Sequence, residues 1–243
     1  MRLFGLIGQP LTHSFSAHYF SEKFLKEGKT DCRYELFPLS SIKELPALLQ
    51  QYPNLEGLNV TSPYKEQVMK YLSSHSIPSA LPACNCIRIQ HGQCSGFNTD
   101  WVGFEKSLLP LLQPKQQAAM VLGKGGAAQA VLYVLKKNGI PYTVVSRQLQ
   151  ADVDRTYEQV TAADLQAHTI VINTTPLGTY PNTALMPTLP YEAVGAGHLF
   201  YDLVYNPAES AFLKQGALRG ARIKNGLEML QLQAEESWTI WNQ

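Results

Sequence analysis

The sequence predicts two α/β domains, each built on a mainly parallel sheet. Short apolar segments alternate with segments that carry apolar residues at helical spacing, which is typical of a parallel sheet covered by helices. The alternation stops near residue 99 and starts again after residue 117. The chain of 243 residues is about 1.6 times as long as a typical domain of about 150 residues. This length permits one large or two small domains, and the restarted pattern favours two.

The first alternation occupies residues 1–99. Its expected elements are strands at 3–7, 32–37 and 55–60 and helices at 15–25 and 42–49. Gly28 ends the first helix. His91-Gly92 is a turn pair between two further short apolar segments, 85–90 and 93–98. This arrangement predicts an antiparallel hairpin at the end of the first unit.

A helical pattern over 100–112 connects the two alternations. The expected elements of the second unit are strands at 118–122, 141–146, 168–172, 198–202 and 221–223, and a helix at 127–138. The last segment, 227–241, is a long amphipathic pattern that follows Gly226. Its neighbours in the sequence contain no obvious packing partner for it.

The charge of the chain excludes a general attraction to polyanions. Twenty Lys and Arg against nineteen Asp and Glu leave a formal net charge of +1. Neither nucleic acid nor an anionic membrane is therefore an expected partner. No apolar stretch reaches the roughly 20 residues that span a bilayer, and Gly8-Gln9-Pro10 interrupts the apolar start of the chain. A cytoplasmic protein is expected.

The four cysteines predict neither a metal site nor disulfides. Cys84 and Cys86 form a C-x-C pair, while Cys32 and Cys94 stand apart, and the chain contains no C-x-x-C pair. These spacings fit neither a zinc ribbon nor a small disulfide framework. We expect small buried thiols in a reducing compartment.

A glycine-rich turn predicts dinucleotide binding in the second unit. Residues 123–128 match G-x-G-x-x-A between an expected strand and an expected helix. Gly123 permits the tight turn, Gly125 allows close approach of a pyrophosphate, and Ala128 allows close packing of helix and strand. The next strand ends in Ser146-Arg147 rather than in an acidic residue, and an arginine can pair with a 2′-phosphate. NADP is therefore preferred to NAD, although Arg147 could also be a solvated loop residue.

Four polar segments lie at strand ends of the first unit, where α/β sheets place their ligands. They are residues 8–16, 59–65, 83–86 and 96–100. A nicotinamide-dependent enzyme needs a group that gives or takes a proton at the reacting oxygen, and these segments supply several candidates.

These segments resemble the signature blocks of the shikimate dehydrogenase family. The blocks are G-x-P-x-x-H-S-x-S, N-V-T-x-P-x-K, G-A-x-N-T and G-x-N-T-D, in that order. The match continues through the nucleotide turn to residues 173–178, 201–207 and 226–234, and so spans almost the whole chain. Several ordered motifs at compatible spacings are far more specific than any one of them.

The resemblance implies reversible, NADPH-dependent reduction of 3-dehydroshikimate to shikimate, a step toward chorismate and the aromatic amino acids. Lys65 and Asp100 would be the catalytic pair. The implied substrate contacts are Ser14, Ser16, Asn59, Thr61, Lys65, Asn85, Asp100, Tyr205 and Gln233. The implied cofactor contacts are Gly123, Gly125, Gly126, Ala127, Ser146, Arg147, Thr174, Leu203 and Gly226. No metal is implied.

The resemblance also implies a domain organisation. Residues 1–99 and 225–243 would form the substrate-binding and catalytic domain, because the last helix would return to it. Residues 100–224 would form a Rossmann-like NADP-binding domain that includes the connecting helix. The expected ligands are small molecules, and the expected assembly is a monomer or a homodimer.

Each candidate has an ordinary structural alternative. Lys65 could be surface charge, Asp100 and the two serines could cap helices, and Gln233 could face solvent. For His13, a positioning role and an ordinary loop position are equally compatible with the sequence. Two other functions also stay open: a quinate/shikimate dehydrogenase with broader substrate or NAD use, and a non-catalytic metabolite-binding regulator on the same fold.

The chain departs from the family pattern at several positions. Cys86 replaces a threonine, Ile77 replaces an acidic residue, and Lys124 replaces a common alanine in the glycine-rich turn. Gln148 replaces a threonine after Arg147, and no second arginine is evident nearby. One arginine still favours NADP, with a smaller margin over NAD than is usual in the family.

Overall fold

The computed structural model describes residues 1–11, 14–114 and 118–243. The chain forms two compact units, Met1–Val102 with Gln233–Gln243, and Gly103–Leu232. The helices α3 (Asp100–Leu108) and α7 (Leu227–Trp241) each contain one of these boundaries. The first unit is therefore assembled from both ends of the chain.

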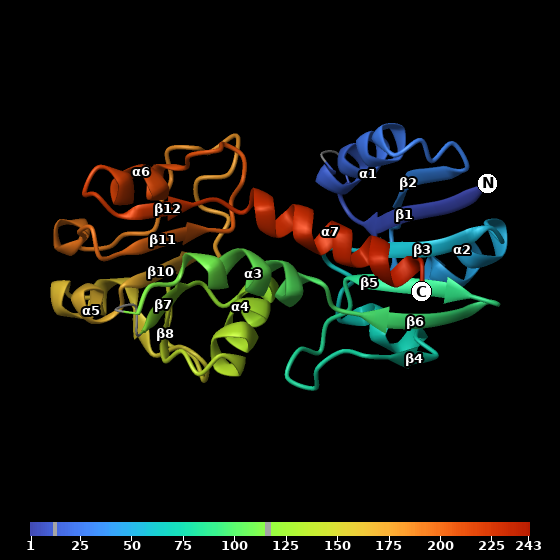
Figure 1. Cartoon of the computed structure of the whole chain (residues 1–243). Helices are drawn as coiled ribbons and strands as arrows, with labels where there is room; N and C mark the ends of the chain where they lie inside the picture. The colour runs from blue at the N-terminus through green and yellow to red at the C-terminus, as the bar shows by residue number, and fades with distance from the viewer. Residues whose placement is uncertain (12–13, 115–117) are drawn as a thin grey trace. The chain divides into compact units, whose positions relative to one another are not determined.

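The first unit contains a six-stranded mixed sheet in the order β2-β1-β3-β5-β6-β4 (Figure 1). The strands are β1 (Arg2–Gly8), β2 (Cys32–Pro38), β3 (Leu55–Val60), β4 (Ser74–His75), β5 (Cys86–Gln90) and β6 (Gln93–Phe97). The first three strands are parallel, and β5 and β6 form the predicted antiparallel hairpin. Its two turn residues, His91 and Gly92, both have positive φ, at 51° and 73°. Such angles match the twist of a two-residue hairpin.

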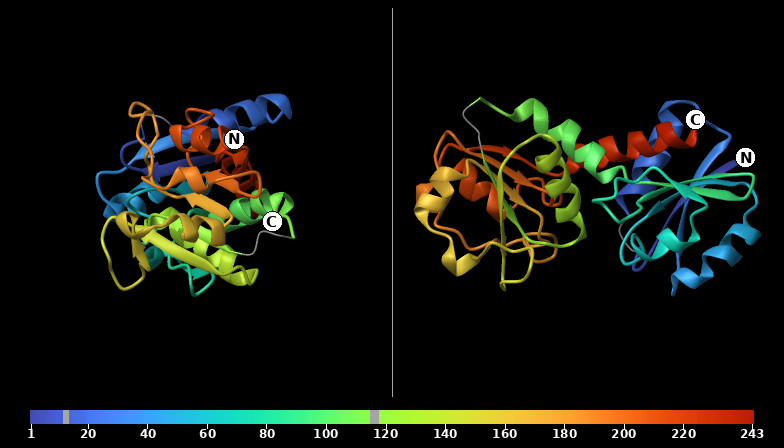
Figure 2. Two further views of the ribbon diagram at one scale, coloured as in Figure 1. Left: turned by 90° about the vertical axis from the view of Figure 1, so that its left-hand side faces the viewer. Right: turned by 90° about the horizontal axis from the view of Figure 1, so that it is seen from below.

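Aromatic packing fixes the C-terminal part of α7 to the first sheet. Phe4 of β1 stacks on Trp241 with ring centroids 4.9 Å apart, and the indole Nε1 of Trp241 donates to the carbonyl oxygen of Ile87 at 2.9 Å. Phe20 and Phe24 of α1 (Phe15–Lys26) complete this core. Figure 2 shows α1 and this part of α7 on one face of the sheet. The other face carries α2 (Leu45–Gln51), which continues the 3₁₀ turn η1 (Ile42–Glu44), and the unit also contains η2 (Gln67–Tyr71).

The second unit contains a six-stranded parallel sheet in the order β12-β11-β10-β7-β8-β9. The strands are β7 (Ala119–Leu122), β8 (Tyr142–Ser146), β9 (Arg155–Thr156), β10 (Ile170–Asn173), β11 (Leu199–Asp202) and β12 (Arg222–Lys224). The helices are α3, α4 (Gly126–Lys137), α5 (Ala162–Ala167) and α6 (Ala211–Ala217), with 3₁₀ turns η3 (Leu109–Leu111), η4 (Tyr157–Gln159) and η5 (Tyr191–Ala193). Helices cover both faces of this sheet (Figure 2), and every residue of β7, β10 and β11 is buried.

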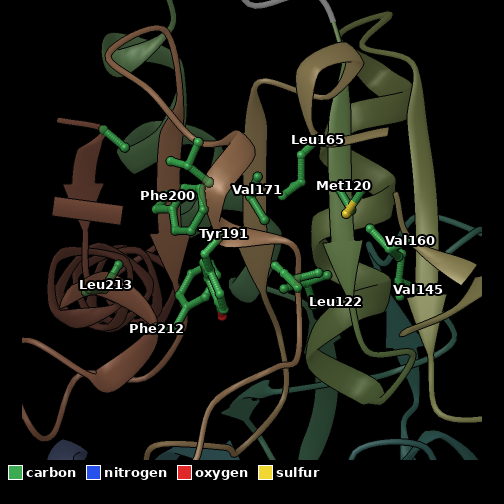
Figure 3. Packing of buried hydrophobic residues seen from close by; sticks show 13 residues of the cluster. Met120, Leu122, Val145, Val160, Leu165, Val171, Tyr191, Phe200, Phe212 and Leu213 are labelled. Carbon is green, nitrogen blue, oxygen red and sulfur yellow. The ribbon is translucent and has the colours of Figure 1, made fainter. Parts of the chain in front are cut away.

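The core of the second unit lies between its central strands and α6 (Figure 3). Phe200 stacks on Phe212 with ring centroids 4.7 Å apart, and Met120, Leu122 and Val171 pack in the same cluster. Strands that are buried on both faces carry continuous apolar runs, which is why these segments were predictable without an alternating pattern. The predicted fold class, two α/β units of which the second is Rossmann-like, is confirmed.

Several short elements differ from the prediction. The helix expected at 100–112 ends at Leu108 and continues as η3, where Pro110 removes a backbone donor. The sequence did not predict α5 and α6, which have six and seven residues. Their caps, Thr161 and Ser210, were the available signals, since each side chain accepts from a backbone N–H of the first turn.

Among the described residues, no helix is both long and apolar enough to cross a bilayer. The same residues contain no group of three or more His, Cys, Asp or Glu that could hold a metal ion. All four cysteines are free, and Cys84, Cys86 and Cys94 are buried.

Candidate functional site

An ion pair between Lys65 and Asp100 lies at the centre of the polar residues of the first unit. The Lys65 ammonium donates to Asp100 Oδ2 at 2.6 Å. The two side chains are 30% and 19% exposed, so solvent reaches the pair without surrounding it. Lys65 follows β3, whereas Asp100 follows β6 and begins α3. The fold thus joins two residues that are far apart in the sequence.

Asn85 fixes the second oxygen of the same carboxylate. Its amide Nδ2 donates to Asp100 Oδ1 at 2.8 Å and to the hydroxyl of Thr99 at 3.0 Å. Its carbonyl Oδ1 accepts from the backbone N–H of Thr99 at 2.6 Å. Asn85 is 3% exposed and Thr99 is fully buried. Each oxygen of Asp100 therefore has its own donor, and this fixes the orientation of the carboxylate.

A buried polar network continues from Thr99 to α7. The Thr99 hydroxyl lies 3.4 Å from Gln233 Oε1 and 3.3 Å from Ser237 Oγ. The Ser237 hydroxyl donates to the carbonyl oxygen of Gln233 at 2.9 Å and accepts from Asn59 Nδ2 at 3.0 Å. Gln233 is 7% exposed, so the alternative that it faces solvent is wrong. The returning helix contributes directly to this polar network.

Tyr34 extends the network to the start of α1. Its hydroxyl donates to Asn59 Oδ1 at 2.8 Å. Burial raises the pKa of Tyr34 well above its ordinary value, and a hydrogen bond from Ser16 opposes this rise. Tyr34 was not predicted as a site residue, because it lies within a strand and outside every motif. Only its register beside β1, where it pairs with Phe4, brings it to this position.

Three further substrate candidates, Ser14, Thr61 and Tyr205, lie in different parts of the fold. Ser14 is the N-cap of α1, and its hydroxyl accepts from the backbone N–H of Ala17 at 3.2 Å. Thr61 follows β3 with a half-buried side chain, and its backbone N–H donates to Ile7. Tyr205 belongs to the second unit. His13 lies outside the described residues.

A separate cavity of about 320 Å³ opens at the carboxyl ends of β7, β8 and β10 in the second unit. It is lined by Gly123, Lys124, Gly125, Ser146, Arg147, Tyr157, Thr174, Thr175, Pro176 and Leu177. Five of the predicted cofactor contacts therefore share one cavity. Among the residues that the structure describes, no carboxylate lines it.

The glycine-rich turn has the backbone that a dinucleotide requires. Gly123 has a φ of +104°, and a Cβ there would lie 2.8 Å from the Thr174 hydroxyl. Helix α4 begins at Gly126, and its N-cap, Gly125, supplies no side-chain cap. A Cβ at Gly125 or Gly126 would meet only open space, so a ligand can approach the amides at the helix start, including that of Ala127.

Gly126, Ala127, Leu203 and Gly226 lie outside this lining, and the last two contact each other. A Cβ on Gly226 would clash with the Leu203 carbonyl oxygen. Leu203 N–H donates to the carbonyl of Asn173 at 2.9 Å, and Asn173 Nδ2 donates to the carboxylate of Asp202 at 2.9 Å. Burial raises the pKa of Asp202 to about 6. This network ties the residues after β10 to those after β11.

Tyr157 is the second residue that the sequence analysis missed. It lies in η4, after the short strand β9. Burial raises its pKa to about 12, and the positive charge of Arg147 opposes this rise. Within the described part of the chain, its hydroxyl is buried and has no hydrogen-bond partner. No functional motif marks this position, and the available local signal was the capping box of Thr156 and Gln159 at the start of η4.

Comparison with known proteins identifies the family. A relative from Clostridium beijerinckii, named shikimate dehydrogenase (NADP(+)), is 35% identical over 100% of this chain and 93% of its own length. A relative of the same name from Methanococcus maripaludis is 33% identical over 99% of this chain and 91% of its own length. The chain belongs to the shikimate dehydrogenase family.

A family model and a solved structure agree with this assignment. The model described as the shikimate dehydrogenase substrate binding domain matches residues 6–87. The structure of shikimate 5-dehydrogenase from Thermus thermophilus, in complex with NADP(H) and shikimate, has a TM-score of 0.85 and 28% identity. The match covers 99% of this chain and 93% of that chain.

Two departures from the family pattern are buried in the first unit. Ile77 is 8% exposed, and its aliphatic side chain offers neither an acid nor a base. Cys86 is fully buried beside Ser237, and burial raises the pKa of its thiol far above the ordinary value. The thiol therefore fills the position of the family threonine as a neutral group.

Proposed function

We propose that the chain is a shikimate dehydrogenase, an NADP-dependent oxidoreductase that interconverts 3-dehydroshikimate and shikimate on the route to chorismate and the aromatic amino acids. The observation that carries this proposal is the 2.6 Å contact between Lys65 and Asp100, with Asn85 bound to the other carboxylate oxygen. Reduction of a ketone requires a proton donor at the oxygen, and a positioned ammonium can supply that proton.

The residues of the second unit fit NADP. The uncapped start of α4 offers backbone N–H groups to a pyrophosphate, and Arg147 with Ser146 offers charge and a hydroxyl to a 2′-phosphate. The open space at Gly125 and Gly126 is where a side chain would obstruct such a ligand. We therefore assign cofactor binding to this unit and substrate binding to the first unit. When bound, NADPH supplies the hydride that reaches the carbonyl carbon.

In the proposed mechanism Lys65 moves the proton. As the carbonyl oxygen gains negative charge, the Lys65 ammonium donates a proton to it, and the neutral amine then recovers a proton from solvent. The partial exposure of Lys65 permits this exchange. Asp100 holds the ammonium in place and stabilises its charge. Oxidation of shikimate follows the same steps in reverse.

Polar groups around this pair would hold the substrate carboxylate and hydroxyls. We assign Ser14, Ser16, Thr61 and Gln233 to direct contacts. Asn59 already donates to Ser237 and to the carbonyl of Asn85, and its Oδ1 accepts from Tyr34, so it can offer the substrate the second lone pair of Oδ1. Tyr205 and Gly226 are assigned to the nicotinamide end of the reaction by resemblance alone. We further propose a cytoplasmic enzyme that acts as a monomer or a homodimer.

A four-way assay tests this function. Shikimate and quinate are each supplied with NADP and with NAD, and reduced nicotinamide is followed by absorbance at alkaline pH. We expect shikimate with NADP to give the highest kcat/KM. Quinate with NAD as the better pair would replace the proposal with a quinate/shikimate dehydrogenase. The absence of all shikimate-dependent reduction would favour a non-catalytic regulator.

A further inference from the structure

We propose that Lys124 is a second cation for the 2′-phosphate of NADP and thereby helps to determine cofactor specificity. This inference rests on the cofactor part of the proposed function. Lys124 lies between Gly123 and Gly125 of the turn and lines the same cavity as Ser146 and Arg147.

The register of β7 and β8 places Lys124 and Arg147 at equivalent positions just beyond the ends of these neighbouring strands. Leu122 at the end of β7 pairs with Val145 of β8, and the N–H of Gly123 donates to the carbonyl of Val145 at 2.8 Å. Lys124 and Arg147 each follow this pair by two residues. Neighbouring strands lie about 4.8 Å apart, so the backbone positions that carry these two long cationic side chains are close together.

The lining of the cavity carries positive charge. Lys124 and Arg147 are its two cationic lining residues, and no carboxylate lines it among the residues described. Neither side chain has an ion-pair partner within that part of the structure. Two like charges that share a cavity repel each other, and a dianionic phosphate would relieve this repulsion. A 2′-phosphate beside Ser146 is such a ligand.

The other nearby cation is already neutralised. Arg155 of β9 pairs in register with Val145, which places it close to the end of β8. Its guanidinium lies 3.3 Å from a carboxylate oxygen of Asp164, and it does not line the cavity. The pyrophosphate, in turn, has the uncapped amides of α4. The role of a second phosphate-binding cation therefore falls to Lys124.

Binding of two nucleotides that differ only in the 2′-phosphate tests this inference. The probes are 2′,5′-ADP and 5′-AMP, titrated calorimetrically into the wild-type chain and into Lys124→Ala, Lys124→Arg and Arg155→Ala at one ionic strength. A single charge-assisted contact predicts about tenfold weaker binding of 2′,5′-ADP to Lys124→Ala. Binding of 5′-AMP should change less than twofold, Lys124→Arg should retain most of the affinity, and Arg155→Ala should change neither ligand by more than twofold.

Four results would overturn the inference. Equal weakening of both nucleotides in Lys124→Ala would assign the lysine to the shared 5′-phosphate, and no change in either would make it a solvated residue. If Arg155→Ala weakened 2′,5′-ADP binding as much as Lys124→Ala does, the effect of Lys124 would be a non-specific electrostatic one rather than a direct contact. Wild-type protein that binds neither nucleotide would overturn both this inference and the cofactor assignment. Nucleotide binding as predicted, without turnover of shikimate, would refute the proposed function alone.

Discussion

Removal of Asn85 tests whether the proposed catalytic pair, Lys65 and Asp100, depends on a fixed orientation, because this substitution leaves both residues of the pair in place. In Asn85→Ala the buried N–H of Thr99 loses its 2.6 Å acceptor, and an unsatisfied buried donor costs about 1–3 kcal/mol. Asp100 Oδ1 loses its amide donor but can still reach water, because the side chain is 19% exposed. With the small void that remains, we expect unfolding free energy to fall by about 3 kcal/mol.

The same variant should lower kcat by about tenfold, because Asp100 and with it Lys65 lose their fixed orientation. Unfolding is measured by circular dichroism in urea, and kcat by shikimate-dependent formation of NADPH. Trp241→Phe is the matched control, since it removes the Nε1 donor to the Ile87 carbonyl and leaves the hydrogen bonds among Lys65, Asp100 and Asn85 in place. It should cost a similar amount of stability and leave kcat within twofold. An Asn85→Ala protein with wild-type stability and kcat, or an equal loss of kcat in the control, would refute this reasoning.

Three further perturbations follow from the second unit. Gly226→Ala should lower unfolding free energy by roughly 3 kcal/mol in urea titrations, because its Cβ would clash with the Leu203 carbonyl oxygen; wild-type stability would contradict this close approach. The raised pKa of Asp202, about 6, favours its protonated form in the folded state. Its stabilising contribution is therefore present below pH 3.8 and is lost as pH rises through about 6; an Asp202→Asn protein with the same pH profile of stability as wild type would disprove this. Arg147→Ala should weaken NADP binding about tenfold while NAD binding changes little, and equal effects on both cofactors would reject the 2′-phosphate contact.

Periodic patterns predicted the long elements because their burial leaves a signal in the sequence. The prediction for α7 matches its observed bounds, and β3 was also predicted at its observed residues. The two short helices α5 and α6 were missed, since six or seven residues contain fewer than two full turns. The 3₁₀ character of η1 was missed as well, because its capping box also begins α-helices.

Motifs indicated the candidate site residues but not the contacts among them. Lys65, Asp100 and Asn85 each lie in a recognisable block, yet their hydrogen bonds depend on how β3, β5 and β6 associate. Tyr34 and Tyr157 carry no motif, and both reach their positions through strand pairing or a short turn. Tertiary contacts of this kind join residues that are distant in the sequence, as the 134-residue separation of Thr99 and Gln233 illustrates.

The kcat of Lys65→Ala, measured together with its affinity for shikimate, tests the central claim most directly. Loss of the proton donor should lower kcat by roughly 10²–10⁴-fold, while shikimate binding weakens far less. The ion pair is partly exposed, so its loss should cost at most about 1 kcal/mol of stability, and unfolding cannot account for the lost activity. A Lys65→Ala protein with unchanged kcat would remove this residue from the mechanism and contradict the account.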